Sequence, residues 1–142
     1  MASTFKYRLR GPFGGLAADL TVEYRTPDPS EEFRLQVYRN VCLTLPDGVN
    51  WRDAAWLSFG LSVHAPDLSA AHPDGLTVKV TSLSFPLAHF RAEVAALAMD
   101  GWVREEFGLV DRGFHAVSCE GGEGYIFRWG EHFDPFSDDG FK

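Results

Sequence analysis

The sequence predicts an α+β fold, in which a curved, mainly antiparallel sheet of about seven strands packs on one principal helix at 87–107. Three observations lead to this prediction. Short stretches alternate apolar and polar side chains, which is the pattern of strands with one covered face. One long stretch repeats its apolar residues every three to four positions, as an amphipathic helix does. Glycine and proline turns separate neighbouring strands, so hairpin connections should dominate. The expected order is five strands, the helix and two strands.

The first two expected strands, 4–10 and 20–25, alternate aromatic or aliphatic side chains with mostly charged ones. The segment 11–15 between them is rich in glycine and is typical of a turn, so the pair is predicted to form an antiparallel hairpin.

The third expected strand, 32–45, has the most regular alternation in the chain, with nearly all its apolar residues at odd positions. Arg39, between Tyr38 and Asn40, is the exception, because the pattern places it among the apolar residues. Two interpretations stay open: a bulge turns Arg39 outward, or its guanidinium lies on the concave face beside an acid or a ligand.

A short helical turn at 51–55, capped by Asn50, is expected before a fourth strand. That strand is predicted at 57–65, where Leu57, Phe59 and Leu61 alternate with small residues until His64. Residues 66–75 are expected to form a loop.

A strand is predicted from Leu76, and its alternation slips after Thr81, which indicates either a bulge near Ser82 or a strand end whose two faces are both covered. The principal helix follows after a proline. Its apolar face includes Gly101, where a missing side chain would let the sheet approach closely, and Gly108 is a plausible left-handed stop. Asp100 and Arg104, four positions apart, are expected on its solvated side.

A second hairpin is expected from strands at 114–119 and 125–129. Residues 1–130 are predicted to form one domain, and 131–142 an aromatic-acidic tail, in which Phe133 and Phe136 are interspersed with acidic residues. The tail either packs across Met99 and Trp102 or remains free to dock on a partner.

The chain carries 20 acidic and 13 basic residues, for a net charge of -7. This charge argues against a nucleic-acid partner and mildly favours a basic protein partner. There is neither an export signal nor an apolar run of spanning length, so we expect a cytoplasmic protein with no membrane partner. A homodimer through an exposed edge strand or through Trp102 is a further possibility.

No known catalytic or nucleotide-binding motif occurs in the sequence. His64, Asp67, His72 and Asp74 have donor types that zinc prefers, but this spacing is also typical of loop turns, so no metal and no cofactor are expected. Residues that break their local pattern are better candidates for binding a ligand or partner. Together with the tail phenylalanines they are Tyr38, Arg39, Asn40, His64, Trp102, Phe133 and Phe136.

Two functional hypotheses follow. The first is a small acidic binding module, such as an inhibitor, an immunity-type protein or an accessory subunit, which engages a basic protein partner through its tail and outer helix edge. The second is a small-molecule enzyme or ligand-binding protein with an aromatic cavity between helix and sheet, where Arg39 would bind an anionic group. The sequence leaves open whether the protein is an enzyme.

Overall fold

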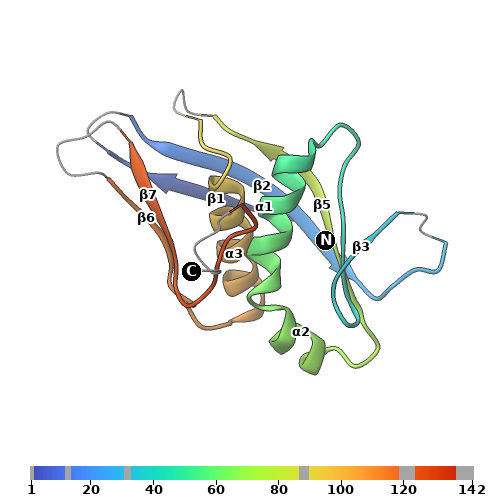
Figure 1. Ribbon diagram of the computed structural model, residues 1–142. Coiled ribbons are helices and arrows are strands. Elements are labelled where there is room, and N and C mark those ends of the chain that lie inside the picture. The colour runs from blue at the N-terminus through green and yellow to red at the C-terminus, as the bar shows by residue number, and fades with distance from the viewer. Residues whose placement is uncertain (1, 12–13, 31–32, 87–89, 119–123, 137–142) are drawn as a thin grey trace.

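The computed structural model describes residues 2–11, 14–30, 33–86, 90–118 and 124–136. These residues form seven strands and three helices (Figure 1), which confirms the predicted α+β class. In chain order the elements are β1 (Ser3–Leu9), β2 (Leu16–Arg25), β3 (Leu35–Tyr38), β4 (Val41–Thr44), α1 (Trp51–Ser62), α2 (Ala65–Ala71), β5 (Leu76–Ser84), α3 (Val94–Phe107), β6 (Phe114–Ser118) and β7 (Tyr125–Trp129).

The strands form two sheets rather than one. Five of them follow the order β1-β2-β5-β4-β3, and β6 pairs only with β7. Within the larger sheet β4 and β5 run parallel, while the other neighbours are antiparallel. The parallel pair arises because α1 and α2 carry the chain from β4 to β5, and a helical crossover can return a strand in the same direction. The expectation of a single curved, mainly antiparallel sheet is therefore corrected to a mixed sheet that is not strongly curled, plus a separate hairpin.

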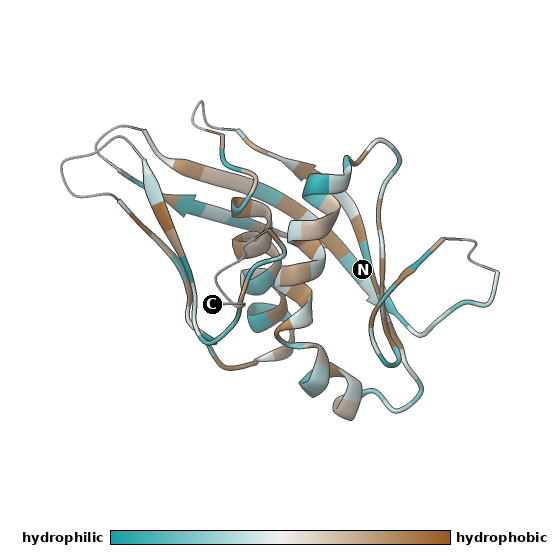
Figure 2. Cartoon of the chain, in the orientation of Figure 1, coloured by the Kyte–Doolittle hydropathy of each residue, from teal (hydrophilic) through white to brown (hydrophobic). Residues whose placement is uncertain are grey.

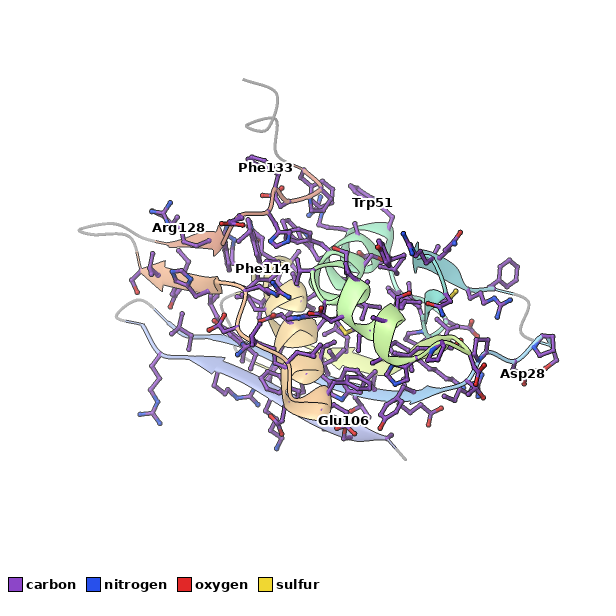
Figure 3. All side chains as sticks on the ribbon, turned by 90° about the horizontal axis from the view of Figure 1, so that it is seen from below. Asp28, Trp51, Glu106, Phe114, Arg128 and Phe133 are labelled. Carbon is purple, nitrogen blue, oxygen red and sulfur yellow. The ribbon has the colours of Figure 1, made fainter. Side chains whose placement is uncertain are left out.

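The helices lie between the larger sheet and the β6–β7 hairpin. α3 packs on β1 and β2, and α1 packs on α3. Figure 3 shows the larger sheet on one side of the helices and the hairpin on the other. Because α3 is covered from several directions, its residues from Val94 to Val103 are all buried. Figure 2 accordingly shows hydrophobic colours running along α1 and α3 in the middle of the molecule. This explains why the apolar sector of α3 is wider than one face.

Several local predictions are confirmed. The pairing of β2 with β5 shifts register between Thr21 and Val22, which places the expected bulge of β5 at Thr81. Gly101 lies under the ring of Phe5, whose atoms leave no space for a Cβ there. Gly108 ends α3 with φ 65°, in the left-handed conformation that glycine adopts without strain. Both predicted hairpins, β1–β2 and β6–β7, are present.

The fourth predicted strand is wrong, because most of 57–65 belongs to α1. Asn50 caps this helix as expected, since its side-chain oxygen accepts the Asp53 N–H at 2.8 Å. The buried residues Trp56, Leu57, Gly60 and Leu61 repeat at helical spacing. The alternation suggested a strand because Phe59, between Leu57 and Leu61, is also apolar. In the structure Phe59 lies on the flank of α1, where the β6–β7 hairpin covers it. Within the expected loop 66–75, residues through Ala71 belong to α2.

Two further boundaries differ from the prediction. The single strand expected at 32–45 is a hairpin, β3–β4, with Arg39 and Asn40 in its turn. The alternation does not reveal the turn, because the apolar residues remain at odd positions in both β3 and β4. The helix expected from residue 87 begins at Val94, while Phe90 and Arg91 are not helical and residues 87–89 lie outside the described part of the chain.

Candidate functional site: an aromatic-acidic hollow

A cluster of aromatic rings joins α1 to the β6–β7 hairpin. The ring of Trp56 stacks on that of Trp129 with centroids 5.4 Å apart. Phe59, one turn further along α1, lies 5.0 Å from Phe114 and 5.2 Å from Trp129. Figure 3 shows Phe114 between the hairpin and the helices. Offset and edge-to-face rings at such distances attract one another beyond their apolar burial, so this cluster holds the hairpin on α1.

The start of the tail lies over the same cluster. The ring of Phe136 is 5.1 Å from Trp56 and 5.7 Å from Trp51. Asp134 Oδ1 accepts the backbone N–H of Phe136 at 2.8 Å, which is a local turn that fixes where this ring points. The tail therefore packs on α1, rather than across Met99 and Trp102 as one interpretation expected. Residues 137–142 lie outside the described part of the chain.

A hollow of about 320 Å³ opens between these elements, and we call it the aromatic-acidic hollow. Its lining combines four aromatic rings with two carboxylates: Trp56, Phe127, Trp129, Phe136, Glu93 and Asp134. A neighbouring hollow of about 440 Å³ shares Trp56, Glu93 and Phe136 and continues to the exposed rings of Trp51 and Phe90. The two hollows together make an open aromatic surface beside α1.

The charges of the hollow are unequally compensated. Glu93 Oε2 accepts a hydrogen bond from Arg91 at 2.6 Å, and this arginine also lies 4.8 Å from the ring centroid of Phe127. Asp134 uses one oxygen for the Phe136 N–H, and no ion pair joins it to a described residue. Aromatic faces and an uncompensated carboxylate both attract a cation. The arrangement can therefore accommodate a positively charged group.

On the other side of the tail lies a second apolar depression, of about 490 Å³. Phe133 lines it together with β3 and the outer side of α1, including Leu35, Val37 and Phe59. Phe133 itself is 66% exposed. The two tail phenylalanines predicted as binding residues thus lie in different hollows, and only Phe136 shares its hollow with carboxylates.

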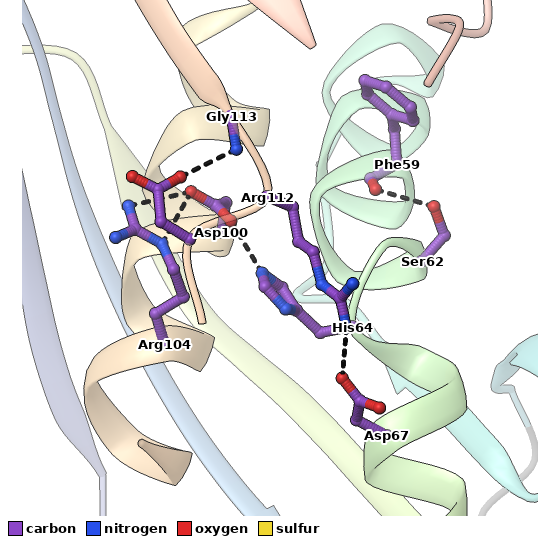
Figure 4. Close-up of polar contacts among 9 residues, drawn as sticks. Phe59, Ser62, His64, Asp67, Asp100, Arg104, Arg112 and Gly113 are labelled. Carbon is purple, nitrogen blue, oxygen red and sulfur yellow. Dashed lines mark hydrogen bonds and ion pairs between the residues drawn. The ribbon is translucent and has the colours of Figure 1, made fainter. Parts of the chain in front are cut away.

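His64 lies in a buried polar network instead of on a groove (Figure 4). Its Nε2 is 2.7 Å from Asp100 Oδ1, and Arg104 binds the other oxygen of Asp100 at 3.0 Å. Asp100 is only 1% exposed, so the expected solvated position on α3 is corrected. The helical wheel places Asp100 opposite the sheet, where the junction of α1 and α2 covers it. His64 is fully buried, and its Nδ1 has no hydrogen-bond partner among the described atoms. The network joins the α1–α2 junction to α3.

The remaining predicted site residues lie apart from the aromatic-acidic hollow. Trp102 is 2% exposed, and its Nε1 donates to Ser3 Oγ at 2.9 Å. Tyr38, Arg39 and Asn40 lie at the β3–β4 turn, where Arg39 is exposed to solvent and not enclosed between helix and sheet.

Trp56, Trp129, Glu93 and Asp134 are not among the binding residues predicted from the sequence. The 12 Phe, 4 Trp and 4 Tyr of the chain and its acidic tail indicate an aromatic-acidic surface, but only the fold brings α1, β7 and the tail together. No family model, curated protein or solved structure matches this chain. In the described part of the chain, no helix has both the length and the apolar character to cross a membrane.

Proposed function

We propose that the protein is a small binding module that engages a basic segment of a partner protein at the aromatic-acidic hollow. The observation that supports this most directly is the lining itself, in which four rings surround the carboxylates of Glu93 and Asp134. A lysine or arginine side chain can place its alkyl part against the rings and its charge near Asp134. The net charge of -7 adds a long-range attraction for a basic partner.

The surface around the hollow extends this contact. Trp51 is 68% exposed and Phe90 is 52% exposed, and both line the neighbouring hollow. Exposed aromatic residues that gather around one depression are typical of interfaces, since they bury large area with few rotatable bonds. The partner side chain would therefore enter the aromatic-acidic hollow while flanking residues cover Trp51 and Phe90.

The test is an NMR titration of the full chain with an acetylated hexalysine peptide, with a hexaglutamate peptide as the control ligand. We expect hexalysine to shift resonances of residues lining the hollow, and to bind more weakly at high salt because the contact is partly electrostatic. Phe136→Ala should weaken binding by about tenfold and Asp134→Asn by about threefold, as expected for losing a cation–π contact and a partly exposed charge pair.

Asp134→Asn is a conservative change, because an asparagine oxygen can still accept the Phe136 N–H. Phe133→Ala is the matched control: it removes a ring from the same tail but lines the other depression. The proposal is wrong if hexalysine leaves the hollow unshifted, if hexaglutamate binds equally well, or if Phe133→Ala weakens binding as much as Phe136→Ala.

A further inference from the structure

The β3–β4 turn contains the one non-glycine residue with a positive φ in the described part of the chain. Arg39 has φ 48°, and it connects the paired residues Tyr38 and Val41 together with Asn40. Tight hairpin turns that require a positive φ favour glycine, asparagine or aspartate, because other side chains crowd the backbone there. An arginine that is kept in a strained conformation points to a use for its side chain.

The turn is held rigidly by its neighbours. Gln36 Nε2 donates to the Arg39 carbonyl at 2.7 Å. The Asn40 side chain donates to the His72 carbonyl at 2.9 Å and accepts from Ser69 Oγ at 2.7 Å, so it fastens the turn to α2 and the segment after it. The Asn40 carbonyl accepts the N–H of Leu76 at 3.0 Å. These hydrogen bonds hold the backbone of the turn in place, so the position from which the Arg39 side chain extends is fixed.

The guanidinium of Arg39, in contrast, is not used by the fold. It lies 5.5 Å from the Tyr38 ring centroid, and no hydrogen bond or ion pair joins it to another described residue. Arg34 is likewise without such a bond among the described residues. Both arginines line one hollow of about 370 Å³, together with Gln36, Asn40 and Asp74. Among the lining side chains two arginines outnumber one aspartate, and Asp28, which follows the lining residue Pro27, interacts electrostatically with Arg34.

We infer that this hollow is an oxyanion-binding site for a small molecule that carries a phosphate or carboxylate group, bound by Arg34 and Arg39. The planar fork of a guanidinium matches the paired oxygens of either group. Asp74 on the same lining opposes a second negative charge, so the site favours a singly charged small molecule over a polyanion. The site is independent of the aromatic-acidic hollow, since the two linings share no residue.

The experiment is an NMR titration of the full chain with inorganic phosphate at pH 6, where its singly charged form predominates, and separately with acetate. Binding should shift resonances of the β3–β4 turn, and the anion that binds more tightly identifies the preferred group. Arg39→Gly should weaken the binding by about tenfold, as expected for losing a charged hydrogen-bonding partner. The same variant should melt at a higher temperature than the natural chain, because glycine adopts φ 48° without strain.

Asp74→Asn gives a test of opposite sign, since removing its negative charge should tighten anion binding by about threefold. Arg128→Gln, on an exposed position of β7, is the control for a general loss of positive charge. The inference is overturned if neither anion shifts the turn, if Arg39→Gly binds as the natural chain does, or if Arg128→Gln loses as much affinity as Arg39→Gly.

Discussion

The two sides of the helical layer are built from different side chains. Where α3 meets the sheet, Gly101 lets Phe5 rest directly on the helix, many of the buried residues are aliphatic or small, and aromatic contacts gather at the end of α3, where Trp102 and Phe107 meet Tyr24. Where α1 meets the hairpin and the tail, the contact is made by rings such as Trp56, Phe59 and Trp129. Small aliphatic groups interdigitate to high density, whereas large flat rings at the edge of the molecule leave open hollows between them.

This difference determines which side of the helical layer has open hollows at its surface. Polar groups on the helix–sheet side form hydrogen bonds within the fold, as Trp102 Nε1 does in donating to Ser3 Oγ. Those on the aromatic side, such as Asp134, remain partly available. One side therefore specifies the fold and the other offers a surface, and the following changes test this division in descending order of their expected effect.

The buried network should be the most sensitive point. Asp100→Ala leaves His64 and Arg104 without their carboxylate, and we expect the free energy of unfolding to fall by about 3–5 kcal/mol, since a buried partner is left uncompensated. Urea denaturation followed by tryptophan fluorescence measures this. The control is Asp67→Ala, which removes the ion pair between Asp67 and Arg112 (Figure 4). This pair is 2.7 Å long, as short as the contact between His64 and Asp100, but both of its side chains are exposed. Its loss should cost about 1 kcal/mol or less. Equal losses from both variants would contradict a structural role specific to the buried pair.

Two helix glycines should respond differently to alanine. A Cβ on Gly60 would lie 2.5 Å from the Ala96 carbonyl oxygen, so Gly60→Ala must push α1 away from α3 and should cost about 1–3 kcal/mol. The three atoms nearest to a Cβ on Gly101 all belong to the ring of Phe5, whose half-buried side chain can rotate away. Gly101→Ala should cost less, because alanine also recovers about 1 kcal/mol of helix propensity. Thermal melts followed by circular dichroism compare the two. A lower melting temperature for Gly101→Ala than for Gly60→Ala would contradict this order.

The tail phenylalanines should differ in stability as well as in binding. Phe136→Ala removes ring contacts with Trp51 and Trp56 and should lower the free energy of unfolding by about 1 kcal/mol. Phe133→Ala, at a mostly exposed ring, should change it by less than about 0.5 kcal/mol. Chemical denaturation of both variants in parallel gives the comparison. Equal effects would mean that the tail does not pack on α1 through Phe136.

The smallest expected effect depends on pH. Burial raises the pKa of Asp53 above its usual value of 3.8, against the opposing effects of Asn50 and Arg52. The folded chain therefore holds this proton more tightly than the unfolded chain, so the stabilisation is present at low pH and is lost as the pH rises above 3.8. Asp53→Asn should raise the melting temperature slightly at pH 7 and leave it nearly unchanged at pH 3. Melts at the two pH values check this, and a variant that is less stable at pH 7 would contradict it.

Secondary structure was predicted correctly from the sequence where the local pattern of side chains is compatible with only one kind of element. The patterns of β1, β2, β6 and β7 indicate strands, so both hairpins were predicted, and the bulge was one of two explanations expected for the slip after Thr81. The prediction failed at 57–65, where a short apolar run is compatible with the period of a strand and with that of a helix. The flank of α1 that carries Phe59 is covered by the β6–β7 hairpin, which lies far along the chain. Arg39 was correctly singled out as a break in its pattern, but a two-residue turn between strands of matching phase was not recognised.

The candidate site shows the same limit. Phe136 was named from the sequence because the tail alternates phenylalanine with acidic residues. Trp56, Trp129 and Glu93 appear ordinary in their own segments and become a site only when α1, β7 and the segment before α3 meet. Asp100 looked like a solvated helix residue because the wheel shows which side it lies on, but not that another helix junction covers that side.

The position of β5 in the sheet has a consequence for biosynthesis. It lies between β2 and β4, yet it follows both in the chain, together with the crossover helices. Until it is translated, the hairpins β1–β2 and β3–β4 have no strand that joins them, and α3 comes later still. Because chains emerge from the ribosome with their N-terminal segments first, residues 1–75 appear with two unmatched strand edges. The two hairpins can therefore join into one sheet only after their central strand has been synthesised.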